Sequence, residues 1–246
     1  MSVPTAWFHV DPLPAVGATT VLDDREATHA VRVRRLGDGA AMTLFDGRGR
    51  IAAATIETVR SAGTPRAGRA VEVTITSVAA LPAPAPFIHL ACALPKSDRQ
   101  STLLGMATQL GMNAFTPLKT GRAVVDAGRN FHERGRRICI EACKQSRRAW
   151  LPDLRSPRTL DHVLAHPDPA GATIWIADPE GTAAADVPIA GDGLLVLIGP
   201  EGGFEPGEVD AADAAGAVRV ALGDGILRIE TAAIATLAVV RARSRR

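Results

Sequence analysis

The chain has 246 residues, a length that fits one large domain or two modest ones, and we expect two. Hydrophobic residues make up 46% and charged residues 22%, the composition of a soluble protein with a substantial core, and no apolar run approaches the roughly 20 residues that a membrane-spanning helix requires. The net charge of +2 is too small to indicate a nucleic-acid partner by itself.

The first residues, MSVPTAWFHVDP, lack the basic-then-apolar pattern of a secretion signal, so we expect a cytoplasmic protein that does not bind a membrane. From Trp7 to about Ser77 the sequence has the pattern of short strands joined by turns. Asp46 and Gly47 form a turn signal, and the runs 51–59 and 70–78 are rich in β-branched residues at near-alternating positions. This pattern predicts a small β-barrel or sandwich.

The segment 79–87, AALPAPAPF, places three prolines in a stretch that is incompatible with a helix and typical of an interdomain linker. We therefore expect two domains, residues 1–78 and residues 79–246. Beyond the linker, strand-like runs alternate with helical ones, which implies a mainly parallel sheet with helices on its faces. The expected strands lie at 87–94, 113–118, 172–178, 194–199 and 218–222, and the expected helices at about 97–111, 133–148, 206–215 and 230–243.

The helix expected at 133–148 carries two of the three cysteines. Cys139 and Cys143 lie four residues apart, and His132 lies seven residues before Cys139, so one helix face could carry all three as metal ligands. The simpler interpretation is that the cysteines are small buried hydrophobic side chains, and we expect no metal. Three cysteines without a disulfide spacing also fit a reducing compartment.

The segment Leu194 to Phe204, LLVLIGPEGGF, combines a strand buried on both faces with a glycine pair at its carboxyl end. Ligands bind at this end of the strands in open α/β sheets, and glycines let the backbone approach a flat ligand. The next helix has a clear start, with Glu205 as N-cap, Pro206 in the first position and Glu208 near the positive end. The alternative is a tight strand-to-helix turn without a ligand.

The segment Leu222 to Ala232, LGDGILRIETA, also leaves a strand and carries Gly223 and Gly225. Two glycine-bearing loops at equivalent strand ends can close over one ligand. Neither contains a Gly-Lys-Ser/Thr phosphate loop or the G-x-G-x-x-G fingerprint, which argues against a nucleotide hydrolase and a Rossmann dehydrogenase. We therefore expect a ligand without phosphates.

Both loop motifs closely resemble the signature motifs of the ribosomal RNA small subunit methyltransferase E family, which belongs to the SPOUT superfamily. The segments 29–49, 93–99 and 141–154 resemble that family as well, in the right order. The resemblance implies an α/β protein in which a PUA-like, RNA-binding β-barrel precedes a SPOUT-type domain with a deep trefoil knot. It also implies a homodimer that uses S-adenosylmethionine to methylate N3 of a uridine in 16S ribosomal RNA of the small ribosomal subunit.

The resemblance assigns the cofactor contacts to the two loops and to a third strand end. They are Ile198, Gly199, Pro200, Glu201, Gly202, Gly203, Leu222, Gly223, Ile226, Leu227 and Thr231, with Ala177, Asp178 and Pro179 after the strand ATIWIAD. Basic residues cluster around Arg32, between Arg134 and Arg148, and from Arg241 onward, and such clusters either follow a phosphate backbone or are solvated surface. For phosphate contacts with RNA we name Arg32, Arg35, Arg147 and Arg148.

Uridine N3 carries a proton and is a poor nucleophile until that proton leaves. Our hypothesis is that the guanidinium of Arg228 stabilises the negative charge on a uracil carbonyl oxygen or orients the base, with Glu230 as its catalytic neighbour. The alternative is that Arg228 pairs with Glu230 or Glu201 and only holds the loop. Either carboxylate could also be the base or contact the cofactor, and the sequence leaves this open.

The chain departs from the family pattern at a few positions. Ile229 stands where the family usually has Thr, Met106 and Gln109 replace a lysine and an acidic residue, and Ala6 replaces an arginine. These changes leave two alternatives to the methyltransferase. One is an RNA-binding or ribosome-assembly protein of the same fold with weak or no catalysis, and the other is a SPOUT enzyme that acts on a different RNA.

Overall fold

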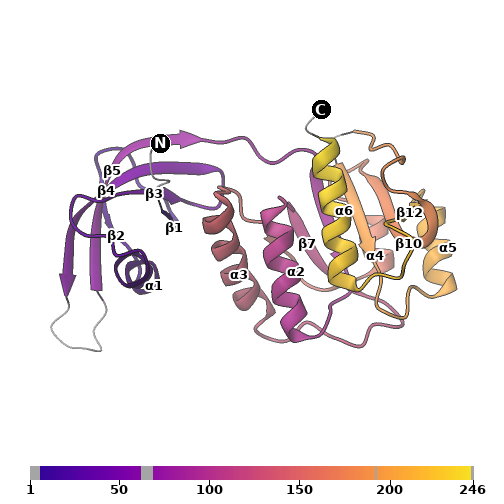
Figure 1. Cartoon of the computed structure of the whole chain (residues 1–246). Helices are drawn as coiled ribbons and strands as arrows, with labels where there is room; N and C mark the ends of the chain where they lie inside the picture. The colour runs from indigo at the N-terminus through magenta and orange to yellow at the C-terminus, as the bar shows by residue number, and fades with distance from the viewer. Residues whose placement is uncertain (1–5, 62–68, 192, 245–246) are drawn as a thin grey trace. The chain divides into compact units, whose positions relative to one another are not determined.

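The computed structural model describes residues 6–61, 69–191 and 193–244. The chain forms two compact units, which are described separately (Figure 1). Unit 1 comprises Met1–Ala83 and Cys143–Leu151, and unit 2 comprises Pro84–Ala142 and Pro152–Arg246. Within the described residues, no helix is both long and apolar enough to cross a membrane.

Unit 1 contains a five-stranded sheet, which confirms the expected N-terminal β-structure. Its strands are β1 (Trp7–His9), β2 (Thr19–Val21), β3 (Ala41–Phe45), β4 (Arg50–Ser61) and β5 (Arg69–Ala80), in the order β1-β3-β4-β5-β2. All pairs are antiparallel except β1 with β3. Alternate residues of these strands, among them Leu44, Ile56 and Val73, form a buried core, as the β-branched alternation predicts.

Our reading of the N-terminal region as strands and turns is wrong for residues 24–33, which form the helix α1 (Asp24–Thr28) and the π-helix η1 (His29–Val33). The Asp23 side chain caps α1 by accepting a hydrogen bond from the Glu26 amide at 2.8 Å. Ala27 and Ala30 are fully buried against the sheet core. The Asp23 cap and the burial of two alanines therefore favour a helix here, although strands precede and follow this segment.

The end of helix α3 (Phe131–Ser146) and the residues after it complete unit 1. The turn 46–49 pairs with them, since the Gly49 amide donates to the Ala149 carbonyl at 3.0 Å and the Leu151 amide to the Gly47 carbonyl at 2.9 Å. Gly49 has a φ of +93°, and a Cβ there would lie 2.4 Å from the Trp150 ring. The turn predicted at Asp46 and Gly47 thus also binds the backbone of Ala149 and Leu151, which follow it by about 100 residues in the chain.

Unit 2 contains a parallel sheet, as the alternation of strands and helices predicts. Its strands are β6 (Phe87–Cys92), β7 (Ala114–Lys119), β8 (Asp153–Leu154), β9 (Arg158–Thr159), β10 (Thr173–Ala183), β11 (Gly193–Ile198) and β12 (Val218–Ala221). The order is β12-β10-β11-β6-β7-β8, and β9 pairs with β7. All six residues of β11 are buried, as expected for a strand covered on both faces.

Helices cover both faces of this sheet. Helices α2 (Ser97–Gln109) and α6 (Ile229–Arg243) lie side by side on one face (Figure 1). Helices α4 (Leu160–Ala165) and α5 (Pro206–Ala214) pack on the other through Leu160, Val163 and Ala212. The α/β class is therefore confirmed, and the trefoil knot stays a prediction.

The predicted start of α5 is confirmed. Glu205 is the N-cap and Pro206 stands in the first turn. One oxygen of the Glu208 carboxylate accepts a hydrogen bond from the Glu205 amide at 2.8 Å. This capping box fixes the direction in which the chain leaves the loop after β11.

The cysteines of α3 are buried, and burial raises the pKa of the Cys139 thiol to about 11. Its thiol is therefore neutral at pH 7, as a packing role requires. No group of three metal-ligating side chains occurs within the part of the chain that the structure describes.

Candidate functional site

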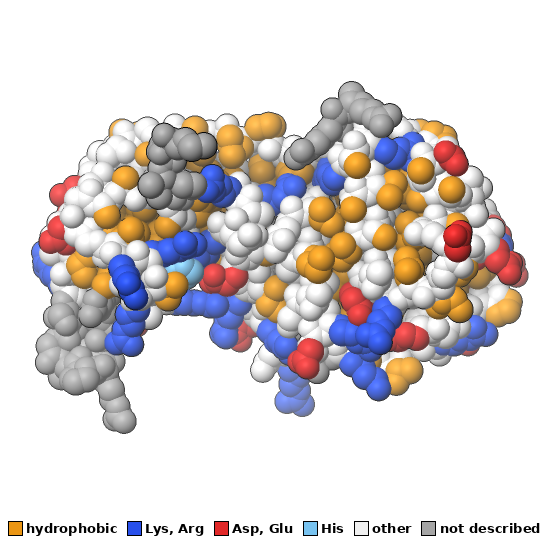
Figure 2. Space-filling view, viewed as in Figure 1, with side chains coloured by type: hydrophobic (Ala, Val, Ile, Leu, Met, Phe, Trp, Pro, Cys, Tyr) orange, Lys and Arg blue, Asp and Glu red, His pale blue; other side chains and the backbone are white. Residues whose placement is uncertain are grey.

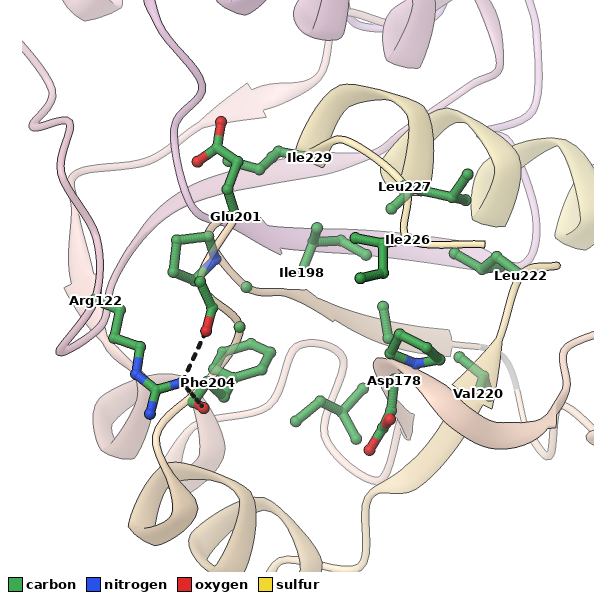
Figure 3. Close-up of a pocket in the computed structure, with 18 of the residues that line it drawn as sticks. Arg122, Asp178, Ile198, Glu201, Phe204, Val220, Leu222, Ile226, Leu227 and Ile229 are labelled. Carbon is green, nitrogen blue, oxygen red and sulfur yellow. Dashed lines mark hydrogen bonds between the residues drawn. The ribbon is translucent and has the colours of Figure 1, made fainter. Parts of the chain in front are cut away.

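A pocket of about 310 Å³ opens at the carboxyl ends of three neighbouring strands, β10, β11 and β12 (Figure 3). The loop 199–204 leaves β11, the loop 222–228 leaves β12, and a bulge in β10 forms a further wall. Because the strands are parallel, their carboxyl ends meet at one edge of the sheet, which is the usual ligand site in open α/β folds.

Glycines shape the loop after β11. Gly203 has a φ of +70°, a conformation that side chains disfavour. A Cβ on Gly199 would lie 3.0 Å from carbon atoms of the Phe204 ring, so this ring packs directly on the glycine backbone. The loop can therefore turn sharply and present main-chain groups to the pocket.

The loop after β12 brings apolar side chains over the pocket. Ile226 is 87% exposed and lies close to the buried Ile198, with Leu222 and Leu227 beside it (Figure 3). Gly223, with a φ of +143°, allows the chain to turn here. An exposed isoleucine in a concave apolar site is costly in water, and a flat ligand between Ile226 and Ile198 would cover it.

The bulge in β10 supplies the remaining wall. Ala177 and Thr182 both pair with Val220, so residues 178–181 bulge out of the ladder. Asp178 and Pro179 thereby line the pocket, and the Asp178 carboxylate lies 3.7 Å from the guanidinium of Arg219. The sequence pattern predicts a strand at this position but not the bulge within it.

The structure brings together nearly all residues assigned to cofactor contact. Thr231 is the exception: it lies exposed in the first turn of α6 and is not among the residues that line the pocket, so its contact with the cofactor stays a prediction. Arg228 and Glu230 also do not line the cavity, although Ile229 between them does. The lining residues that agree are Ala177, Asp178, Pro179, Ile198, Gly199, Pro200, Glu201, Gly202, Gly203, Leu222, Gly223, Ile226 and Leu227.

Arg122, in the segment that follows β7, also lines the pocket and was not predicted from the sequence. Its Nη1 donates to the carbonyl oxygens of Gly202 at 2.7 Å and Phe204 at 3.3 Å (Figure 3). The neighbouring Gly121 amide donates to the second Glu208 oxygen at 2.9 Å. These contacts fix the loop after β11, and the only signal in the sequence is that Arg122 follows the end of a parallel strand.

Sequence analysis also missed Arg99, in the first turn of α2. Its Nη1 lies 3.4 Å from Glu201 Oε1 and 3.5 Å from Glu230 Oε2, so Arg99 occupies the place that one alternative gave to Arg228. Arg228 is the exposed N-cap residue of α6, and in the described part of the chain the structure gives it no ion pair. Burial, with the charge of Glu230, raises the pKa of the nearby Cys92 thiol far above its usual range.

Comparison with known proteins identifies the family. Residues 82–241 match a family described as "RNA methyltransferase domain", and residues 22–62 match an "RNA methyltransferase PUA domain". The ribosomal RNA small subunit methyltransferase E of Mycobacterium tuberculosis is 35% identical over 247 aligned residues, covering 95% of this chain and 90% of the relative. The chain belongs to the ribosomal RNA small subunit methyltransferase E family. The resemblance of the loop motifs is thereby confirmed.

Solved structures agree with the methyltransferase E assignment. A methyltransferase from Legionella pneumophila, in complex with bound S-adenosylmethionine, is 30% identical with a TM-score of 0.87, covering 98% of each chain. The ribosomal RNA small subunit methyltransferase E of Neisseria gonorrhoeae, bound to S-adenosyl methionine, is 28% identical with a TM-score of 0.86, again over 98% of each chain. The fold is therefore shared along nearly the whole length.

The departures from the methyltransferase E pattern occupy different environments. Ile229 is buried and lines the pocket, so an apolar group stands where the family pattern has a hydroxyl. Met106 is a partly exposed residue of α2, and Gln109 ends that helix. Ala6 packs against the core of unit 1. Only Ile229 bears directly on the pocket.

The four arginines named for RNA all belong to unit 1, although more than 100 residues separate the pairs. Arg32, Arg35 and Arg147 are exposed, and Arg148 is half-buried. Arg35 and Arg147 have φ values of +55° and +56°, which are uncommon for residues other than glycine. Lys and Arg side chains gather around α1 in unit 1 (Figure 2).

Proposed function

We propose that this chain transfers a methyl group from S-adenosylmethionine to N3 of a uridine in 16S ribosomal RNA. One observation carries this proposal: the two glycine loops and the β10 bulge form one pocket from the residues that the family motifs supply. The names of the relatives and the S-adenosylmethionine in two similar structures support it.

The pocket residues fit S-adenosylmethionine. Ile198, Ile226 and Leu227 offer apolar surface to the flat adenine, and the loop glycines leave main-chain groups accessible for its polar edge. Glu201 and Asp178 offer carboxylates for the hydroxyl and amino groups. When bound, S-adenosylmethionine supplies an electrophilic methyl group on a positively charged sulfur.

Arg228 acts on the uridine. Arg228 lies in the chain between the pocket residues Leu227 and Ile229 and is exposed, and we assign to its guanidinium the stabilisation of the negative charge that uridine gains when N3 loses its proton. Glu230 and Glu201 are the neighbouring carboxylates and the candidate proton acceptors. The pH dependence of turnover in Glu230→Gln and Glu201→Gln separates them, because loss of the base removes the acidic limb of the profile.

Unit 1 binds the RNA backbone through Arg32, Arg35, Arg147 and Arg148, which give affinity rather than sequence choice. We assign RNA binding to the N-terminal β-domain, residues 1–78, together with the arginines that α3 brings to it. The enzyme works in the cytoplasm on the small ribosomal subunit or its RNA.

The protein works as a homodimer. Helix α6 carries mainly Ala, Ile and Val around its circumference, yet Ala238 is exposed and so is Met106 of the adjacent α2. A helix that is apolar on every face is usually buried, and hydrophobic side chains gather over α2 and α6 (Figure 2). Sedimentation of the wild type and of Ala238→Glu tests this, with a dimer expected only for the wild type.

The decisive experiment is mass spectrometry of 16S RNA from a strain that lacks the gene. We expect N3-methyluridine to disappear and to return with the wild-type gene but not with Arg228→Ala. Methylation at the wild-type rate by Arg228→Ala would end the catalytic assignment, and unchanged N3-methyluridine in the deletion strain would contradict the substrate. A methyl group missing from another RNA would instead indicate a different substrate.

A binding or assembly protein with weakened catalysis is the second candidate, and the buried Ile229 favours it, because the hydroxyl of the family pattern is lost inside the pocket. Calorimetry with S-adenosylmethionine separates the two. Measurable heat and a thermal shift support the enzyme, whereas their absence supports the binding protein.

A further inference from the structure

Arg99 joins three separate segments of unit 2 around one guanidinium nitrogen. It lies in the first turn of α2, while Glu201 comes from the loop after β11 and Glu230 from the first turn of α6, just beyond the loop after β12. Nη1 lies within 3.4 Å and 3.5 Å of the two carboxylates. We infer that Arg99 is a positioning residue that holds the two loops together over the ligand, an inference that rests on the proposed function.

The surroundings of this ion pair make it stronger than one on the surface. The Arg99 side chain is 28% exposed and that of Glu230 is 13% exposed, so solvent screens this pair less than a fully exposed one. Glu201 is more exposed and adds less. Without Arg99, two carboxylates would face each other without a cation between them, and their repulsion would push the loops apart.

Arg99 and Arg228 therefore divide two tasks that the sequence could not separate. Arg99 pairs with Glu201 of the loop after β11 and with Glu230 of α6 and does not line the pocket, whereas Arg228 has no ion pair within the described residues and stays exposed at the N-terminus of α6. Loss of Arg99 weakens ligand binding because the pocket opens. Loss of Arg228 slows methyl transfer because the uridine anion loses its stabilising charge.

The test uses the full chain and four variants, of which Arg228→Met serves as the comparison for turnover. Arg99→Met removes the charge while keeping much of the length, and Arg99→Lys keeps a cation between the carboxylates. Arg134→Met is the matched control, because Arg134 lies in the same unit and its guanidinium bonds the Ser101 hydroxyl rather than a loop carboxylate.

Calorimetry measures the Kd for S-adenosylmethionine. We expect Arg99→Met to raise it about tenfold, equivalent to about 1.4 kcal/mol. Arg99→Lys should recover most of this loss, and Arg134→Met should bind like the wild type. Turnover at saturating S-adenosylmethionine should fall far less in Arg99→Met than in Arg228→Met. A wild-type Kd in Arg99→Met, or no recovery with Lys, would overturn the inference.

Hydrogen exchange of the ligand-free chain gives a second readout. Amides of residues 199–204 and 222–228 should exchange faster in Arg99→Met than in the wild type or Arg134→Met, since the loops open more often. Unchanged exchange would refute the role of Arg99. If the wild type binds no S-adenosylmethionine, the proposed function fails, and hydrogen exchange still decides whether Arg99 holds the loops.

Discussion

Lys144 Nζ lies 3.0 Å from the Glu26 carboxylate inside unit 1, where the two side chains are only 5% and 4% exposed. The Lys144 ammonium also lies 3.3 Å from His29 Nδ1 and 5.7 Å from the centre of the Phe8 ring. This pair joins α1 to the end of α3. It therefore holds the chain that carries Arg147 and Arg148 against the β-domain.

Replacing Glu26 with Gln should destabilise unit 1 by about 3–5 kcal/mol, because the buried Lys144 ammonium would lose the carboxylate that lies 3.0 Å away. Urea unfolding of the full chain measures the change. Glu72→Gln is the control, since Glu72 pairs with Arg60 on the exposed surface of the same sheet and should cost at most about 1 kcal/mol. Equal losses in the two variants would contradict the importance of burial.

Stability should also fall with acid because of His89. Burial, and secondly the charge of Arg155, lower the pKa of His89 from 6.5 to about 4 in the folded chain. The folded state thus prefers the neutral ring, so its stabilising effect is complete above pH 6.5 and is lost as the pH falls towards 4. From the size of the shift we expect a loss of about 3 kcal/mol.

Urea unfolding at pH 7 and pH 4.5 checks this expectation. His89→Gln, which keeps a polar group facing the Thr116 hydroxyl 2.8 Å from His89 Nε2, should lose clearly less stability over that interval than the wild type. Protonation of Asp and Glu side chains lowers the stability of both chains equally, so the difference between them reports on His89 alone. Parallel pH profiles would show that His89 is not responsible.

Gly181 should tolerate no side chain, because a Cβ there would lie 2.5 Å from the Arg219 carbonyl carbon. Gly181→Ala must push β12 away from the β10 bulge, so we expect a lower Tm and weaker S-adenosylmethionine binding. Gly207→Ala is the control. A Cβ at Gly207 meets nothing within 4 Å, and alanine in this first turn of α5 should leave stability unchanged or raise it by up to about 1 kcal/mol.

Binding of 16S RNA should weaken as salt rises if the arginines of unit 1 contact phosphates. Arg32→Ala and Arg147→Ala should each reduce the slope of log K against log salt by about one unit. Arg60→Ala, which removes an exposed arginine of β4 that pairs with Glu72, is the control. If the slope is the same in the wild type and in all variants, Arg32 and Arg147 do not contact phosphates of the RNA.

The sequence predicts the elements around the pocket well, because their signals are local. The run LLVLIG predicts a strand buried on both faces, and Glu205, Pro206 and Glu208 predict where α5 begins. The glycines of the two loops follow directly after predicted strands, and this alone predicts that they lie at the pocket. The fold near the site therefore follows from residues that are neighbours in the chain.

What sequence analysis missed depends on residues distant in the chain. Arg99 and its partner Glu230 are 131 residues apart in the sequence, and Arg122 and Gly202 are 80 apart. A hydrophobic periodicity does not predict pairs at such separations. The β10 bulge arises only because β12 pairs on both sides of it. Thr231 adjoins the pocket residue Ala232 in sequence, yet it is exposed in the first turn of α6 and does not line the pocket.

The split composition of unit 1 has a consequence for biosynthesis. During translation, residues 1–83 emerge well before Cys143–Leu151, which supply Lys144 and the partners of the 46–49 turn. Until residues 84–142 have also been made, Glu26 lacks the ammonium of Lys144, and the 46–49 turn lacks its backbone partners Ala149 and Leu151. The N-terminal unit therefore completes its folding only after more than half of the polypeptide has left the ribosome.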